Sequence, residues 1–171
     1  MTMGHLISAV YMKKISTSIF GLVSAFLLVT AFTFTGSVAA SANPFKKVAG
    51  SWRSAGATAT ISGNRERIKC RARYKVPGKK VGFTLKCSGP GYFINVRVSG
   101  RVNGKSVSGQ WSESKYAKSG SLNGSATRKS SSLSFWGGGV SGNMYISFKS
   151  SRRHTMVINA AGNKIVIPLR R

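Results

Sequence analysis

Basic residues occupy every second position from residue 65 to residue 75, and this alternation constrains the fold more than any other feature of the sequence. The residues between them are mostly apolar. Side chains that alternate with a period of two belong to a β-strand, which places them on opposite faces of a sheet. We therefore predict a strand with one face in a core and one positively charged face in solvent. The alternating cations are Arg65, Arg67, Lys69, Arg71, Arg73 and Lys75.

A second alternating segment follows the turn at residues 77–80 and predicts a hairpin with the basic strand. If Val76 lies opposite Val81, the same register places Cys70 opposite Cys87 on the inward face. The chain contains no other cysteine. We therefore predict a disulfide bond between Cys70 and Cys87.

The register of this hairpin also predicts neighbours on both faces. Tyr74 is expected opposite Phe83 in the core, and Arg71 opposite Lys86 on the outer face. Lys86 therefore extends the basic strand sideways.

Residues 1–42 have the pattern of a secretory signal peptide. Lysines at positions 13 and 14 precede an uncharged apolar run over residues 15–38, and small residues offer a cleavage site between Ala40 and Ala42. Met12 is a candidate for the true start. An uncleaved membrane anchor stays open as an alternative, because the run approaches the ~20 residues that span a bilayer. Export to the periplasm or the medium also agrees with a structural disulfide.

Residues 43–171 have the size of a single domain. This domain is strongly basic. The sequence holds 27 Lys and Arg against two acidic residues, both of them glutamate, and two of the lysines lie in the leader, so the net charge of the exported part is +23. Self-repulsion of this size implies anionic surroundings or a polyanionic partner.

Short alternating segments with glycine-bearing turns continue to the end of the chain. We expect an all-β domain of 8–10 short strands, preceded by the signal peptide helix. Such a meander closes best as an antiparallel up-and-down barrel, because closure removes exposed edges; a two-sheet sandwich is the alternative. Tyr74, Phe83 and Trp111 fall on core positions, as does Trp52 if Gly56 shifts the phase of its strand.

Two turn dipeptides set the expected registers of further hairpins. The Asn-Gly pair at 103–104 is typical of a two-residue hairpin turn and predicts Val96 opposite Trp111. The Gly-Asn pair at 63–64 predicts the turn before the basic strand.

Four segments together resemble a family of small exported proteins of alphaproteobacteria that have no assigned function. They are Gly-Ser-Trp-Arg at 50–53, Glu-Arg-Ile-Lys-Cys-Arg-Ala-Arg-Tyr at 66–74, Leu-Lys-Cys at 85–87 and Gly-Gln-Trp-Ser-Glu at 109–113. The resemblance implies an exported β domain with this disulfide and brings no activity. The Gly-x-Trp that opens the domain also looks like the lipocalin and avidin barrel superfamily.

The sequence offers little to an enzyme. A glycosidase needs two carboxylates at a defined separation, and Glu66 and Glu113 are the acidic residues available. Both fall on the inward, apolar face of their predicted strands. We therefore predict that both carboxylates are structural, each beside a basic residue at an end of the barrel. His154 is expected directly after the turn at 151–153, with no Asp or Cys nearby. We therefore predict no catalytic residue, no cofactor and no metal site.

The basic strand, together with Lys86, is the feature that points most directly to a function. We predict an anion-binding surface, because guanidinium groups bind phosphate and carboxylate in a bidentate manner. The expected partner is an anionic lipid, a lipopolysaccharide or an acidic polysaccharide. A membrane surface is compatible with this reading, whereas export argues against nucleic acid.

Three alternatives stay open: a solvated basic face without a ligand, a lipocalin-like carrier of a small apolar ligand, and a protein that docks on an acidic partner. An interior cavity of roughly 300 Å³ or more would favour the carrier. Phe93, Tyr116 and Trp136 are candidates for exposed aromatic platforms. The sequence leaves the oligomeric state open.

Overall fold

The computed structural model describes residues 42–171 with the exception of residue 91, so the predicted signal peptide, apart from its last residue, lies outside the described residues. Within this part of the chain, no helix is long and apolar enough to cross a membrane. One short 3₁₀ helix precedes the strands. The elements are η1 (Pro44–Val48), β1 (Gly50–Ser54), β2 (Ala57–Ile61), β3 (Asn64–Lys75), β4 (Lys80–Gly89), β5 (Tyr92–Asn103), β6 (Ser106–Glu113), β7 (Lys118–Ala126), β8 (Ser130–Gly137), β9 (Val140–Phe148), β10 (Arg153–Ala160) and β11 (Asn163–Arg170).

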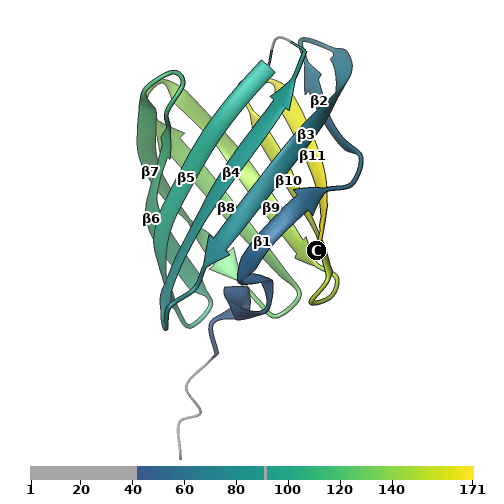
Figure 1. The fold of residues 1–171 in the computed structure, drawn as a ribbon. Coiled ribbons are helices and arrows are strands. Elements are labelled where there is room, and N and C mark those ends of the chain that lie inside the picture. Colours follow the sequence, from purple (N-terminus) through teal and green to yellow (C-terminus); the bar gives the residue numbers. More distant parts are fainter. Residues whose placement is uncertain (1–41, 91) are drawn as a thin grey trace, which may run out of the picture. The chain divides into compact units, whose positions relative to one another are not determined.

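The strands form a closed antiparallel barrel (Figure 1). Each strand from β3 to β11 pairs with the next in sequence, and both β1 and β2 pair with β3 on one side and β11 on the other. β1 and β2 thus share one position, so the barrel has ten strand positions. The predicted up-and-down barrel is confirmed, and the sandwich is excluded.

The break between β1 and β2 lies at Gly56, which has a φ of +78°. Trp52 before the break and Ala57 after it are both buried, although they are five positions apart and an uninterrupted strand would place them on opposite faces. The glycine therefore shifts the phase of the strand, as predicted, and Trp52 enters the core. Residues that have a side chain rarely adopt this φ, which explains why a glycine occupies this position.

The hairpin of β3 and β4 has the predicted register. Cys70 lies opposite Cys87 and Tyr74 opposite Phe83, while Arg71 lies opposite Lys86 on the outer face. The two cysteines are joined by a disulfide bond.

The registers predicted for two other hairpins are wrong by two residues. Val96 lies opposite Glu113, not Trp111, because the two-residue loop begins at Gly104. Gly104 has a φ of +59°, as expected for the first loop position of a type II′ turn. The loop between β2 and β3 likewise lies at 62–63 instead of 63–64. A shift of two residues leaves every side chain on its predicted face, so the core assignments survive.

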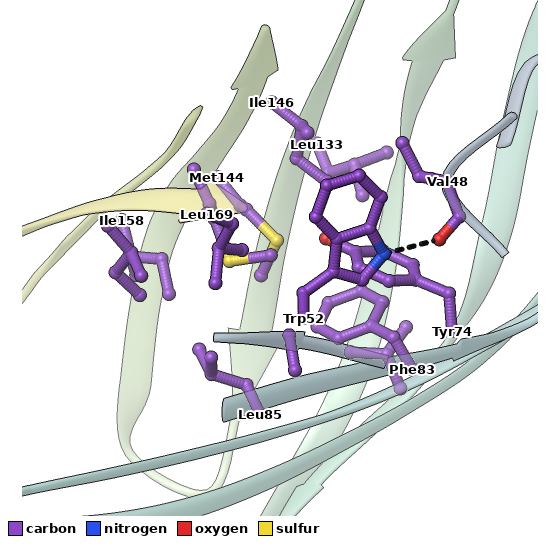
Figure 2. Close-up of a cluster of buried hydrophobic side chains, with 14 of the residues drawn as sticks. Val48, Trp52, Tyr74, Phe83, Leu85, Leu133, Met144, Ile146, Ile158 and Leu169 are labelled. Carbon is purple, nitrogen blue, oxygen red and sulfur yellow. Dashed lines mark hydrogen bonds between the residues drawn. The ribbon is translucent and has the colours of Figure 1, made fainter. Parts of the chain in front are cut away.

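One end of the barrel is filled by large side chains and covered by η1. Figure 2 shows the part of the buried core around Trp52, whose indole Nε1 donates a hydrogen bond of 2.7 Å to the carbonyl oxygen of Val48. The guanidinium of Arg171 lies 4.6 Å from the ring of Trp52 and donates hydrogen bonds to the carbonyl oxygens of Lys47 and Ala49. The predicted core residues Trp52, Tyr74, Phe83 and Trp111 are all buried.

Candidate anion-binding face

The six cations of β3 form a row along the outside of the barrel. All six are exposed, whereas the residues from Ile68 to Tyr74 that alternate with them are buried. From Arg65 to Lys75 the row is about 33 Å long at about 3.3 Å per residue. We call these six residues the longitudinal row.

A second row of cations crosses the first at Arg71. Arg71 lies opposite Lys86 on one side and opposite Arg53 on the other. Beyond Arg53, the pairing continues through Arg170 to Arg153. The five residues, one on each of five adjacent strand positions, are exposed, and we call them the transverse row. The two rows together form the basic face.

The transverse row was mostly missed by the sequence analysis. Pairing of Arg71 with Lys86 follows from one hairpin, but Arg170 reaches Arg53 only because the last strand closes the barrel against the first. Neighbouring strands are about 4.8 Å apart, so like charges directly opposite one another repel. The basic face therefore carries unfavourable electrostatic repulsion between opposed cations.

The opposite wall of the barrel, formed by β6 to β9, is uncharged on its outer face. Every outward residue of these four strands is Ser, Asn or Gln apart from Trp136 and Tyr145. From β3, β8 is reached through four strand positions in either direction. The charge on the outer faces of the strands is thus segregated to one side, while the turns at the ends of the opposite wall keep cations such as Arg128 and Lys129. The distribution of charge along the sequence did not predict this segregation.

The interior holds an apolar pocket at the end of the barrel away from η1. Its volume is about 180 Å³, and its wall includes Trp111, Leu122, Phe135 and Met144. Lys118 also lines this pocket. The volume lies below the 300 Å³ that we set as favouring a carrier, yet it exceeds the 150 Å³ of an engineered apolar cavity that binds benzene.

The two carboxylates differ in their surroundings. Glu113 is buried, and its Oε1 and Oε2 accept hydrogen bonds from the backbone N–H groups of Asn95 (3.0 Å) and Tyr116 (2.7 Å). Burial alone would raise the pKa of this carboxyl; these hydrogen bonds and the charge of Lys115 outweigh it and hold the pKa below its usual value. Backbone amides, more than the basic residue we predicted, compensate Glu113. Glu66 is half-buried, and its Oε2 lies buried without a hydrogen-bond partner.

His154 lies in β10, after the turn that the sequence predicted, and its side chain is buried in the core. Its Nε2 lies 3.1 Å from the hydroxyl of Tyr74, and its ring packs edge-to-face on Trp52. Burial, together with the charge of Arg171, lowers the pKa of His154 to about 4. Burial also raises the pKa of Tyr74. Both side chains are therefore neutral at pH 7 and serve the packed end of the barrel.

The three predicted aromatic platforms are exposed. Phe93, Tyr116 and Trp136 each expose between 42% and 57% of their surface, and Tyr145, which the sequence analysis did not single out, exposes 47%. Among residues 42–171 other than 91, no group of three His, Cys, Asp or Glu side chains is placed to hold a metal ion.

Comparison with known proteins supports the fold alone. No protein-family profile matches the chain, and no curated protein sequence matches it. The crystal structure of Rv2717c from M. tuberculosis is similar over 74% of this chain and 94% of that chain, with 11% identity and a TM-score of 0.53. A redesigned β-barrel, mFAP1, which binds DFHBI, is similar over 75% of this chain and 99% of that chain, with 10% identity and a TM-score of 0.47.

Proposed function

We propose that this protein is an exported, non-enzymatic binding protein that holds polyanionic components of a bacterial cell envelope on its basic face. The observation that carries the proposal is the crossing of the two rows at Arg71, which gathers the ten cations of the basic face on one wall of the barrel. A solvated surface without a ligand has no need to gather like charges opposite one another on five neighbouring strand positions. The disulfide and the resemblance to exported proteins support the compartment.

Arginine predominates in the basic face, which favours phosphate or carboxylate as the bound group. Seven of its ten different residues are arginine, and guanidinium groups bind both anions through paired hydrogen bonds. The anion is the shared chemistry of acidic phospholipids, lipopolysaccharide and acidic polysaccharide.

Binding to phosphatidylglycerol vesicles tests the proposal. Each basic residue near an anionic surface contributes about 1 kcal/mol, so Arg71→Gln with Arg73→Gln should weaken binding by about 2 kcal/mol, or about thirtyfold. Salt should weaken binding by the wild type in the same assay.

The control removes two charges from another part of the barrel. Arg170 is unsuitable because it belongs to the transverse row. Arg128 and Lys129 lie in the exposed turn between β7 and β8, so Arg128→Gln with Lys129→Gln changes the net charge and leaves the basic face intact. Equal losses in the two double variants would show that net charge binds without a site. An absence of binding by the wild type at low salt to the vesicles, to lipopolysaccharide and to an acidic polysaccharide alike would refute the proposal.

The apolar pocket favours a second candidate function, a carrier of a small apolar ligand. The barrel is packed at the η1 end, and the pocket of about 180 Å³ lies at the other. Ala160 lines it. Titration calorimetry with octanoate should show binding by the wild type and weaker binding by Ala160→Leu, which narrows the pocket. Absence of heat with the wild type, or equal affinity of the two proteins, would reject the carrier.

A further inference from the structure

A groove of about 760 Å³ crosses the outer wall beside the basic face, over β3 to β7. It lies where the charged and the uncharged walls meet. Arg73 and Lys75 line one side, and Arg97 on β5 lies two strand positions away. Its volume is within the range of about 300–1,000 Å³ that small-molecule sites occupy.

Small residues on β4 create the groove between these cations. Lys75 lies opposite Gly82, and Arg73 lies opposite Thr84, which in turn lies opposite Arg97. Two strand spacings separate Arg73 from Arg97 by about 10 Å. A glycine and a threonine in the middle leave a depression flanked by three cations.

Uncharged polar side chains continue the groove away from the cations. Ser99, Gln110 and Ser112 line this part and are exposed. Hydroxyl and amide groups both donate and accept hydrogen bonds, which suits a ligand rich in hydroxyl groups. A sugar unit of an acidic polysaccharide carries an anionic group and several hydroxyl groups on one ring, which matches cations and neutral polar side chains placed side by side.

We propose that this groove binds an acidic saccharide, with its carboxylate or phosphate held among Arg73, Lys75 and Arg97 and its hydroxyl groups over Ser99, Gln110 and Ser112. The inference rests on the proposed function and specifies one class of polyanion for it. The cations fix the anionic end of the sugar, and the neutral residues fix its orientation.

A charge-neutral block of the groove tests the inference. A Cβ atom built on Gly82 meets the carbonyl oxygen of Val98 at 3.4 Å, an ordinary contact, so Gly82→Leu fits the backbone and fills the depression. Ser99→Leu blocks the groove from the neutral side and replaces Gly82→Leu as the test variant if Gly82→Leu does not fold. Ser125→Leu, on the outer face of β7 away from the groove, is the matched control. The probes are tetragalacturonate, measured by calorimetry, and phosphatidylglycerol vesicles.

The wild type and Ser125→Leu should bind tetragalacturonate equally. The folded blocking variants should lose at least about tenfold in affinity, the equivalent of one hydrogen bond to a charged group, while their vesicle affinity stays unchanged. Unchanged saccharide affinity in the blocked variants overturns the groove. Vesicle binding without saccharide binding by the wild type overturns the saccharide and leaves the basic face standing, whereas saccharide binding without vesicle binding refutes the lipid-surface test of the basic face and leaves the groove standing.

Discussion

Arg53 on β1 lies directly opposite Arg71 on β3, and both side chains are exposed on the outer face of the barrel. Directly opposed like charges destabilise an antiparallel pair, by roughly 0.2–1 kcal/mol on the scale of cross-strand interactions. The protein therefore carries a stability cost at the position where the two rows cross, and an anion bound under the proposed function would relieve that cost.

Replacing Arg53 by threonine should stabilise the free protein at low salt. Threonine suits a strand, and the substitution removes the repulsion with Arg71, so we expect a gain of about 0.2–1 kcal/mol in the free energy of unfolding by urea. The gain should disappear at 1 M salt, where the screening length is about 3 Å. Arg97→Thr is the control, because Arg97 faces Thr84 and Ser112 instead of a cation. A salt-independent gain, or an equal gain in the control, would contradict the explanation.

The disulfide should contribute about 3 kcal/mol, because it closes a loop between residues 17 positions apart. The variant with both Cys70 and Cys87 replaced by alanine should lose this amount in urea unfolding, and reduction of the wild type should give a similar loss without any substitution. Titration of the purified protein in denaturant without reductant should find no free thiol. Two free thiols would show that the bond does not form.

The register of the β3–β4 hairpin was predictable because two independent signals agreed. The alternation of charges set the faces, and the pairing of Cys70 with Cys87 selected one register. The β5–β6 hairpin had a turn dipeptide but no such second signal, so the prediction missed by two residues while keeping the faces. Alternation determines which face a side chain takes, and it cannot distinguish registers two residues apart.

The transverse row and the groove could not be predicted from the sequence, for a different reason. Arg53 and Arg170 are far apart in the chain, and only closure of the barrel makes them neighbours. The groove needs the side-by-side order of β3, β4 and β5 together with the small size of Gly82. A local pattern carries no information about pairs that ring closure creates.

Stability should fall as the pH decreases from about 6.5 to about 4, because of His154. Its pKa is about 4 in the folded protein and about 6.5 in an unfolded chain, so the unfolded state binds more protons in this interval. The stabilisation is complete above the unfolded pKa and is lost as the pH falls through the interval, with a total of about 3 kcal/mol. Urea midpoints at pH 7.5, 6.0 and 5.0 measure it. His154→Phe, which keeps an aromatic ring beside Trp52, should show a flat profile between pH 7.5 and 5.0, and an unchanged slope would assign the effect to other groups.

Replacing Glu113 by glutamine should destabilise the barrel by about 1–3 kcal/mol at pH 7, because the N–H groups of Asn95 and Tyr116 lose charged acceptors and one faces another donor. The lowered pKa of Glu113 means that this stabilisation is present above about pH 4.5 and is lost below it. Glu66→Gln is the comparison: since Oε2 of Glu66 has no hydrogen-bond partner, its loss should cost about 0.5 kcal/mol or less. Equal losses in the two variants, measured by urea unfolding, would contradict the assignment.

Trp136 reports which wall of the barrel faces a bound surface. Of the three tryptophans, Trp52 and Trp111 are buried, whereas Trp136 exposes 46% of its surface on β8, opposite β3. If the basic face lies on an anionic vesicle, Trp136 points into water. Its emission should then stay unshifted, and lipids with brominated chains should not quench it. A dansyl label on Lys69→Cys, in the longitudinal row, should respond to the same vesicles. A blue shift of Trp136 with quenching by brominated lipid, and a silent label at position 69, would place the uncharged wall on the membrane and refute the proposed orientation.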